Sequence, residues 1–163
     1  MDSMSFSAES YENYMVPGLF APWSAILAES VNPQSGERVL DVACGTGIVA
    51  RHIAPRVGSH GKVIGLDLNP NMLRIARMAA EREGLAIEWR TSPAERLPFP
   101  DVSFDLVLCQ FGLMFFTDRR AALMEFYRVL RTGGRVGLSV WQGLDHHPFY
   151  QIQIGRASCR ERV

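Results

Sequence analysis

The chain has 163 residues, and 47% of them are hydrophobic, which suffices for one domain with a buried core. Its 17 Lys and Arg residues balance its 17 Asp and Glu residues, so we expect no nucleic-acid partner and no attraction to an anionic membrane. No apolar run predicts a membrane span, and the first residues do not resemble a signal peptide. The three cysteines form neither a disulfide framework nor a CxxC pair, so we expect no metal site. Together these features predict a reduced, cytoplasmic location.

The segment before Arg38 is punctuated by prolines and predicts two short helices, at residues 8–15 and 21–31. From Arg38 onward, short β-rich runs alternate with runs of helical periodicity. The expected strands are residues 38–43, 62–68, 86–92, 104–111 and 135–141. The expected helices between them are residues 47–57, 70–83 and 119–131.

Local signals support this division. Asn69 is expected to cap the second of these helices, and Thr117 or Asp118 the third, which residues 132–134 (Thr-Gly-Gly) should end. The unbroken apolar run at 104–111 indicates a strand that is buried on both faces. Strand–helix alternation of this kind predicts a Rossmann-like, doubly wound α/β domain with a parallel sheet covered on both faces.

The run "RVLDVACGTGIVARHI" leads from the first strand through Gly45 and Gly47 into a helix. Such a turn lets a ligand approach the backbone, and the helix that follows offers free N–H groups. Asp67 ends the second strand, 20 residues after Gly47, and in this topology it lies beside the end of the first strand. A carboxylate there can accept hydrogen bonds from two ribose hydroxyls, so the pattern predicts a nucleoside ligand.

Two classes of nucleoside ligand fit the glycine turn. The residues Gly-Thr-Gly-Ile-Val-Ala match the G-x-G-x-x-A fingerprint of dinucleotide sites, which leaves an NAD-dependent oxidoreductase open. Asp41 lies four residues before Gly45, where its carboxylate would repel a pyrophosphate and favour an ammonium group. Asp41 therefore favours a cationic ligand.

Four segments in order carry a family resemblance: "VLDVACGTG", "VIGLDLNPNML", "PAERLPFPDVSFDLVLCQFGLMFF" and "FYRVLRTGGRVGLSVW". Together they resemble the class I S-adenosylmethionine-dependent methyltransferases, in particular the subgroup typified by ubiquinone/menaquinone-biosynthesis C-methyltransferases. The resemblance runs from about Glu37 to Trp141. It implies S-adenosylmethionine as the cofactor.

The resemblance also implies roles for individual residues. Asp41 would meet the amino group of the cofactor, directly or through water, and Asp67 would hold the ribose hydroxyls. The other implied cofactor-binding residues are Ala43, Gly45, Thr46 and Gly47 at the methionine end, Leu68 and Met72 against adenine, Ala94 and Glu95 on the loop at the adenine edge, and Gln110 near the transferred methyl group.

Two positions depart from the family pattern. Ala43 stands where the family often has glycine, a change that needs only an ordinary backbone at that position. Pro93 stands where the family often has an acid that accepts the adenine amino group. We therefore expect adenine recognition to depend on backbone groups and stacking, in a somewhat looser site.

Several residues keep two interpretations. Glu95 either belongs to the site or only caps its own loop. Tyr11 and Tyr14 either close over the cofactor or form one face of a packed helix. The run at 111–116 is expected to be core rather than a wall facing the substrate, and Cys44 a small buried filler rather than a nucleophile.

The predicted activity is methyl transfer to a small-molecule acceptor by in-line displacement, which corresponds to class EC 2.1.1.-. Because the cofactor carries the reactive chemistry, the sequence identifies no catalytic residue. Two alternatives stay open: the NAD-binding oxidoreductase, and a module that binds S-adenosylmethionine without catalysis. Gln110 is a hypothesis for orienting groups near the methyl group.

Three segments are expected: a helical segment at 1–36, the methyltransferase core at 37–153 and a tail at 154–163. The tail has no apolar period, and its residues can be encoded by a sequencing-library adapter, so we expect it to be non-native. The last two strands of such a core would then be missing. We accordingly expect impaired methyl transfer, and self-association through the exposed edge of the strand at 135–141.

Overall fold

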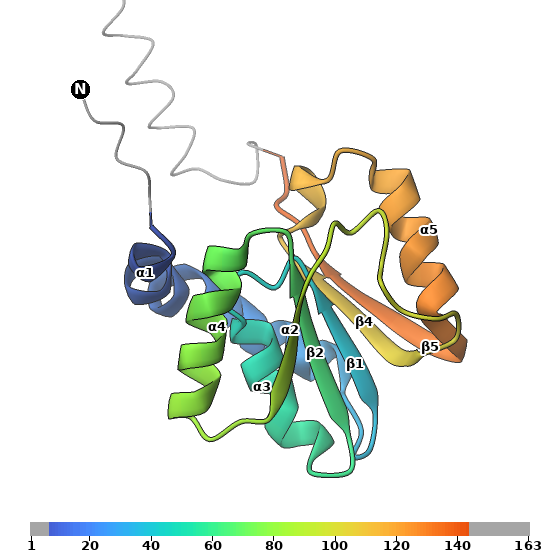
Figure 1. Ribbon diagram of the computed structural model, residues 1–163, viewed down its shortest axis with the longest axis horizontal. Coiled ribbons are helices and arrows are strands. Elements are labelled where there is room, and N and C mark those ends of the chain that lie inside the picture. Colours follow the sequence, from blue (N-terminus) through green and yellow to red (C-terminus); the bar gives the residue numbers. More distant parts are fainter. Residues whose placement is uncertain (1–6, 144–163) are drawn as a thin grey trace, which may run out of the picture.

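A computed structural model describes residues 7–143 of the chain. Its centre is a five-stranded parallel sheet in the order β3-β2-β1-β4-β5 (Figure 1). The strands are β1 (Arg38–Val42), β2 (Lys62–Asp67), β3 (Ile87–Thr91), β4 (Phe104–Gln110) and β5 (Leu130–Ser139). The predicted doubly wound α/β fold is confirmed.

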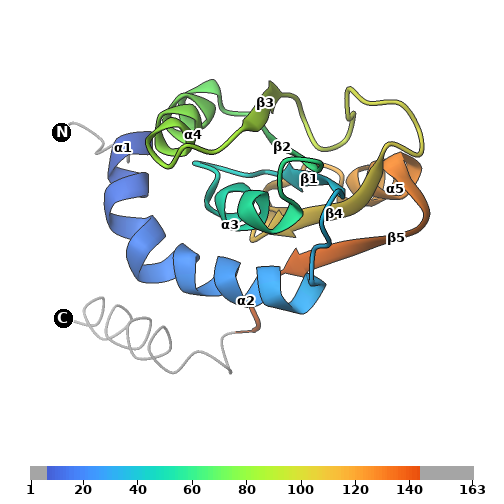
Figure 2. The ribbon, with the colours of Figure 1, turned by 90° about the horizontal axis from the view of Figure 1, so that it is seen from below.

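Three helical segments precede the first strand, and the other helices lie between strands. The helical segments are α1 (Ala8–Ser10), a wider π-helical segment η1 (Tyr11–Phe20), α2 (Ala21–Val31), α3 (Ile48–Val57), α4 (Pro70–Arg82), the 3-10 turn η2 (Leu113–Phe115) and α5 (Arg119–Val129). Helices α2 and α3 cover one face of the sheet and α5 covers the other (Figure 2). The predicted caps are confirmed: the side chain of Asn69 accepts from the N–H of Asn71, and that of Asp118 from the N–H of Ala121.

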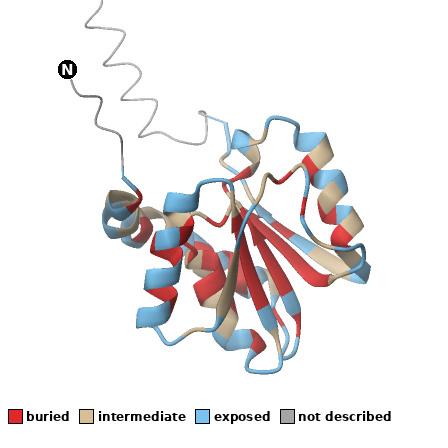
Figure 3. Ribbon diagram, in the orientation of Figure 1, coloured by how far each residue is buried: buried red, intermediate tan, exposed pale blue. Residues whose placement is uncertain are grey.

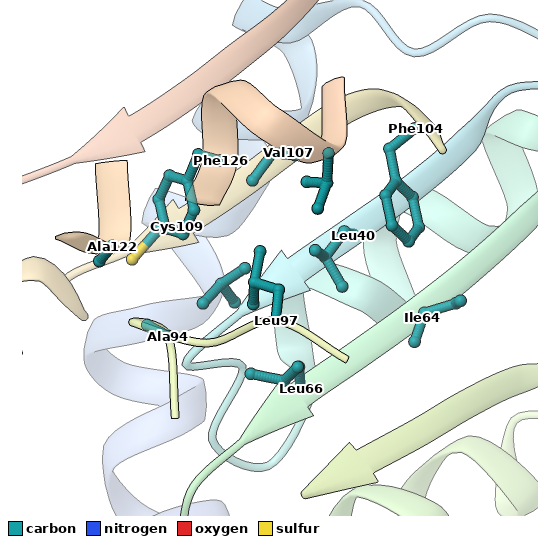
Figure 4. Packing of buried hydrophobic residues seen from close by; sticks show 12 residues of the cluster. Leu40, Ile64, Leu66, Ala94, Leu97, Phe104, Val107, Cys109, Ala122 and Phe126 are labelled. Carbon is teal, nitrogen blue, oxygen red and sulfur yellow. The ribbon is translucent and has the colours of Figure 1, made fainter. Parts of the chain in front are cut away.

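Each face of the sheet packs into its own apolar cluster, because both are covered. Burial is greatest along the central strands (Figure 3), and β4 is buried from Phe104 to Cys109, as its unbroken apolar run predicts. On the α5 side, Leu40, Leu66 and Phe126 belong to a cluster that also includes residues of the loop before β4 (Figure 4). The two clusters hold the strand ends in fixed positions.

The strand order creates a switch point at the centre of the sheet. The chain leaves β1 for β2 on one side, whereas β4 pairs with the other side of β1. In register, Asp41 lies opposite Gly65 of β2 and Leu108 of β4. Ligands of open α/β sheets bind outside the carboxyl ends of the strands at such a point.

The N-terminal segment differs from prediction. Residues 8–31 form one continuous curved helix rather than two short helices, and it runs from beside α4 to α3 (Figure 2). Pro17, which we expected to interrupt it, lies within η1. A widened helical turn accommodates a residue without a backbone N–H, and buried contacts of Val16 and Leu27 hold the segment against the domain.

The start of β5 also differs from prediction. The helix ends at Val129, and strand pairing begins at once, with Leu130 opposite Phe104. The register then jumps, so that Arg135 lies opposite Leu106, and residues 131–134 form a bulge rather than the predicted turn outside the strand. Gly133 and Gly134 lie in this bulge. Gly133 permits it, since its φ of 79° lies in the left-handed region that favours glycine.

Among the described residues, β5 is an edge strand with exposed apolar side chains at Val136 and Leu138, and Val140 directly after it is exposed as well. The exposed edge on which we based the prediction of self-association is therefore present, and the association itself stays a prediction. No helix within residues 7–143 is long and apolar enough to cross a lipid bilayer. The predicted tail at 154–163 lies outside the described residues.

Candidate functional site

The glycine turn joins β1 to α3 through three left-handed residues. Ala43, Gly45 and Gly47 have φ values of 55°, 55° and 83°. The N–H of Gly47 donates to the carbonyl of Cys44 at 2.8 Å, which closes the turn directly before α3 begins at Ile48. The expectation of an ordinary backbone at Ala43 is wrong, because the tight turn holds this residue in the left-handed region that favours glycine.

The two glycines face different surroundings. A Cβ at Gly45 would lie 3.7 Å from the ring of Tyr11, on the side of the cavity described below. A Cβ at Gly47 would lie 2.4 Å from the indole of Trp89, and one at Gly65 would lie 2.3 Å from the same indole. The absence of a side chain at Gly47 is therefore needed for close packing against Trp89, and its predicted contact with a ligand stays a prediction.

A cavity of about 560 Å³ opens at the carboxyl ends of β1, β2 and β4, in the size range of small-molecule sites. Its lining residues are Tyr11, Phe20, Val42, Ala43, Gly45, Leu66, Asp67, Leu68, Asn69, Met72, Ser92, Pro93, Ala94, Glu95, Gln110, Phe111, Gly112, Met114, Phe115, Phe116, Thr117 and Trp141. Eleven cofactor-binding residues were predicted, and the lining contains Ala43, Gly45, Asp67, Leu68, Met72, Ala94, Glu95 and Gln110. The other three, Asp41, Thr46 and Gly47, are absent from the lining and are buried.

Asp67 connects the end of β2 to the glycine turn. One carboxylate oxygen accepts the N–H of Gly45 at 2.8 Å, and the other accepts the N–H of Asn69 at 2.8 Å. These two donors fix the orientation of the carboxylate, while the residue lines the cavity. This is the position that the sequence predicted for an acid that binds ribose.

Asp41 is almost completely buried beneath the turn. Its Oδ2 accepts the N–H of Ala50 at 3.1 Å, and its Oδ1 has no partner among the described residues. Burial, together with the nearby charge of Asp67, raises the pKa of Asp41 to about 8. Asp41 therefore does not contact the cavity directly.

The loop between β3 and β4 forms the opposite wall. The carboxylate of Glu95 accepts the N–H of Thr117 at 2.9 Å and that of Asp118 at 3.3 Å, so Glu95 braces the loop before α5 and also lines the cavity. Ala94 is buried beside it. Leu68, across the cavity, is 68% exposed, which leaves an apolar surface free at its rim.

The N-terminal helix covers the cavity with aromatic side chains. The rings of Tyr11 and Phe20 stack with 5.1 Å between centroids, and both line the cavity, whereas Tyr14 is exposed. Gln110, at the end of β4, donates from Nε2 to the carbonyl of Phe20 at 3.1 Å, and its Oε1 is buried without a partner among the described residues. The prediction missed Phe20, because no local pattern links that segment to β4.

The run at 111–116 has a divided role. Phe111 is buried and stacks on Trp141 with 4.2 Å between centroids, and Phe116 packs edge-on against Phe126. Met114 and Phe115 are exposed, Phe115 to 80%, and both line the cavity. The expectation that the whole run is core is thus wrong for these two residues.

Cys44 is a buried filler, as predicted. Its thiol is enclosed, and burial raises its pKa well above the ordinary value, with smaller contributions from Asp41 and Asp67. A thiol in this state is a poor nucleophile. Within residues 7–143, no three His, Cys, Asp or Glu side chains gather as metal ligands.

The charged groups of the cavity lining restrict the kind of ligand that the cavity can bind. The described lining includes the carboxylates of Asp67 and Glu95 and contains no Lys or Arg. A diphosphate needs cationic or N–H donors, whereas a cation is favoured by carboxylates and by aromatic faces. The cavity is thus suited to a nucleoside that carries positive rather than negative charge.

Comparison with known proteins agrees with this geometry. A family model described as the ubiE/COQ5 methyltransferase family matches residues 2–141. The chain belongs to this family. The predicted resemblance to class I methyltransferases is thereby confirmed.

Individual family members show how much of the chain is comparable. Ubiquinone/menaquinone biosynthesis C-methyltransferase UbiE of Xanthomonas campestris is 39% identical over 135 residues, which are 82% of this chain and 53% of that protein. The protein of the same name from Neisseria meningitidis serogroup C is 40% identical over 130 residues, 78% of this chain and 53% of that protein. The chain spans about half the length of these curated relatives.

Solved structures agree on the architecture. The crystal structure of a putative methyltransferase from Bacillus halodurans superposes with a TM-score of 0.67 at 36% identity, and covers 71% of this chain and 49% of that chain. This likeness agrees with the family match, which spans residues 2–141.

Proposed function

We propose that this chain binds S-adenosylmethionine in the cavity above the glycine turn and transfers its methyl group to a small-molecule acceptor. The observation that carries the proposal is the pairing of Asp67 with a cavity lining that lacks Lys and Arg among the described residues. Membership of the ubiE/COQ5 methyltransferase family supports the same cofactor and reaction class, EC 2.1.1.-.

The residues present fit the chemistry of this cofactor. The Asp67 carboxylate is a suitable acceptor for ribose hydroxyls at the carboxyl end of β2. Gly45 presents backbone rather than a side chain to the cavity, so a ligand can come close to the turn. The exposed face of Leu68 and the neighbouring Met72 provide an apolar surface on which an adenine ring could lie.

Asp41 would act from behind the turn. Its carboxyl group lies beneath the backbone that lines the cavity, so it would meet an ammonium group through water rather than by direct contact, and the positive charge of that group would favour the ionised form of Asp41. Thr46 and Gly47 would contribute through the shape of the turn. These three roles thus differ from direct contacts with the cofactor.

The protein's part in the reaction would be alignment and exclusion of water. S-adenosylmethionine, when bound, supplies an electrophilic methyl group that is transferred by in-line displacement. The rings of Tyr11 and Phe20 would shield the reacting centre from water, and the Gln110 amide at the end of β4 would orient groups near it. No residue is assigned as a general base, because a base is needed only if the acceptor must lose a proton.

The acceptor would enter beside Met114 and Phe115, the exposed apolar residues of the cavity rim. We propose that the chain is located in the reduced cytoplasm, since Cys44 and Cys109 are free, buried thiols. Self-association through β5 and the division into segments 1–36, 37–153 and 154–163 are further parts of the proposal that await tests.

Thermal unfolding with two ligands tests the cofactor assignment. S-adenosylhomocysteine at 100 times its Kd should raise the melting temperature by about 5 to 10 °C, because a ligand that binds only the folded state stabilises it by about 2.7 kcal/mol. NAD at the same concentration should leave the melting temperature unchanged. A rise with NAD and none with S-adenosylhomocysteine would overturn the proposal in favour of the oxidoreductase.

A further inference from the structure

A buried arginine behind the glycine turn contacts three separate elements. Arg51, in the first turns of α3, has a side chain that is only 4% exposed. Its Nη1 donates to the carbonyl of Thr46 at 2.9 Å, its Nη2 donates to Glu12 Oε1 at 2.8 Å, and its Nε lies 3.1 Å from Glu83 Oε1. One guanidinium group thus binds the turn and the N-terminal helix by hydrogen bonds, and it also pairs in charge with Glu83, directly after α4.

Two of these contacts are made by residues that directly follow lining residues of the proposed cofactor cavity. Thr46 lies between Gly45 and Gly47, so its carbonyl is part of the turn itself. Glu12 directly follows Tyr11, whose ring lies over Gly45 and lines the cavity. Movement of the N-terminal helix would break the contact with Glu12, and distortion of the turn would break the contact with Thr46.

Stability alone gives no reason for this arrangement. Burying an ion pair costs desolvation free energy that its mutual attraction often only offsets, and apolar residues of similar size can replace such pairs without loss. The cost here is increased because Glu12 Oε2 and Thr46 Oγ1 are also buried without partners among the described residues. A role in positioning accounts for a charged cluster that packing does not require.

The N-terminal helix has a second tether at the far side of the stacked rings, where Gln110 donates to the carbonyl of Phe20. The Tyr11–Phe20 pair therefore lies between two fixed points. A third contact, the ion pair between Glu9 and Arg74, joins the same helix to α4 at the surface, with both side chains half exposed. It does not touch the turn, so it serves as a matched control.

We propose that Arg51 is a positioning residue, which through Glu12 and Thr46 couples closure of the N-terminal helix over the cofactor to the shape of the glycine turn. The inference rests on the proposed function and goes beyond it, because it assigns a purpose to a residue outside the cavity. It implies that the ligand leaves only after the Glu12–Arg51 contact breaks.

Dissociation of S-adenosylhomocysteine measures this coupling in the 163-residue chain. Glu12→Gln and Arg51→Lys should each speed dissociation about tenfold, as expected for loss of a charged hydrogen bond, while Glu9→Gln stays within about twofold of the wild type. The double variant Glu12→Gln/Arg51→Lys should be no faster than Arg51→Lys alone, since Arg51→Lys already breaks the contact with Glu12. Surface plasmon resonance gives the rates, and melting temperatures without ligand are recorded in parallel.

The possible outcomes distinguish a positioning role of Arg51 from a purely structural role. If Glu12→Gln lowers the melting temperature but leaves dissociation as slow as in Glu9→Gln, the cluster is purely structural and the inference is overturned. Additive effects in the double variant would overturn it as well. If Glu12→Gln fails to fold, Arg51→Lys against Glu9→Gln still decides the result. Absence of any binding by the wild type would instead refute the proposed function itself.

Discussion

The Asp67 carboxylate accepts a hydrogen bond from the backbone N–H of Gly45 at 2.8 Å, across the gap between β2 and the turn that follows β1. The two strands are neighbours in the sheet, so this bond joins two ends that the fold brings together across the intervening helix α3. It also means that the acid is oriented before any ligand arrives, which lowers the cost of ordering the site on binding.

Asp67→Ala should weaken binding of S-adenosylhomocysteine by about ten- to a hundredfold, because hydrogen bonds to a charged group contribute roughly 1.5–3 kcal/mol each. Isothermal titration calorimetry measures the change in Kd. Glu88→Ala is the control, since Glu88 lies on β3, pairs with Lys62 and does not line the cavity. Equal Kd values for both variants would remove Asp67 from the site.

Gly47→Ala should lower the free energy of unfolding by about 3 kcal/mol. The alanine would be strained in the left-handed backbone conformation, and its Cβ would overlap with the ring of Trp89. Gly36→Ala isolates the first contribution, because Gly36 has a φ of 85° and nothing within 4 Å of an added Cβ. We expect a loss of only about 1 kcal/mol there. Urea denaturation compares the two, and similar losses would show that the contact with Trp89 is unimportant.

Asp41→Asn should stabilise the ligand-free chain increasingly as the pH rises. Between about 3.8, the ordinary pKa, and about 8, the folded state keeps a proton on Asp41 that the unfolded state releases. The unfolding free energy of the wild type therefore falls with rising pH across this window, by at most about 1.4 kcal/mol per pH unit from this group, and levels off above it. The asparagine side chain does not ionise, so the unfolded state gains nothing from releasing a proton. Its side-chain oxygen can still accept the N–H of Ala50.

Urea denaturation of both chains at pH 5 and pH 8 tests this pH dependence. The difference in unfolding free energy between Asp41→Asn and wild type should be larger at pH 8. A difference that does not change with pH would mean that Asp41 is ionised in the folded chain throughout.

Arg128→Lys should loosen the loop that carries Ala94 and Glu95. The Arg128 guanidinium donates to the carbonyls of Leu97 and Phe99 at 3.1 and 2.8 Å, and a lysine cannot reproduce this fork. We expect a loss of about 1–3 kcal/mol in unfolding free energy and weaker S-adenosylhomocysteine binding.

The matched control is Arg131→Lys, because Arg131 lies just after α5 and pairs with Asp105, away from that loop. Differential scanning fluorimetry and calorimetry give the two readouts. If Arg131→Lys weakens binding as much as Arg128→Lys does, the loop is not the cause.

Local sequence signals predicted the first four strands, the helix caps and a doubly wound parallel sheet with its first two strands side by side, because alternation of β-rich and helical runs leaves few topologies open. Asp67 was predictable for the same reason, since its position follows from the end of β2. The bulge at 131–134 was not, because it depends on where Leu130 meets Phe104, a contact between distant parts of the chain.

Local sequence signals also could not predict the helix that covers the cavity. Pro17 suggested a break, yet packing of Val16 and stacking of Phe20 on Tyr11 maintain a continuous helix. Gly47 matched a ligand-binding pattern although its contact is with Trp89. In both cases the deciding partner lies far away in sequence, where periodicity and capping rules carry no information.

The indole of Trp89, pressed against Gly47 and Gly65, gives the molecule a natural optical reporter. Indole emission responds to its immediate surroundings, and this ring touches the reverse side of the turn without entering the cavity. With Trp23 and Trp141 replaced by phenylalanine, the emission of the remaining tryptophan would follow the turn in real time, free of direct quenching by whatever occupies the other side.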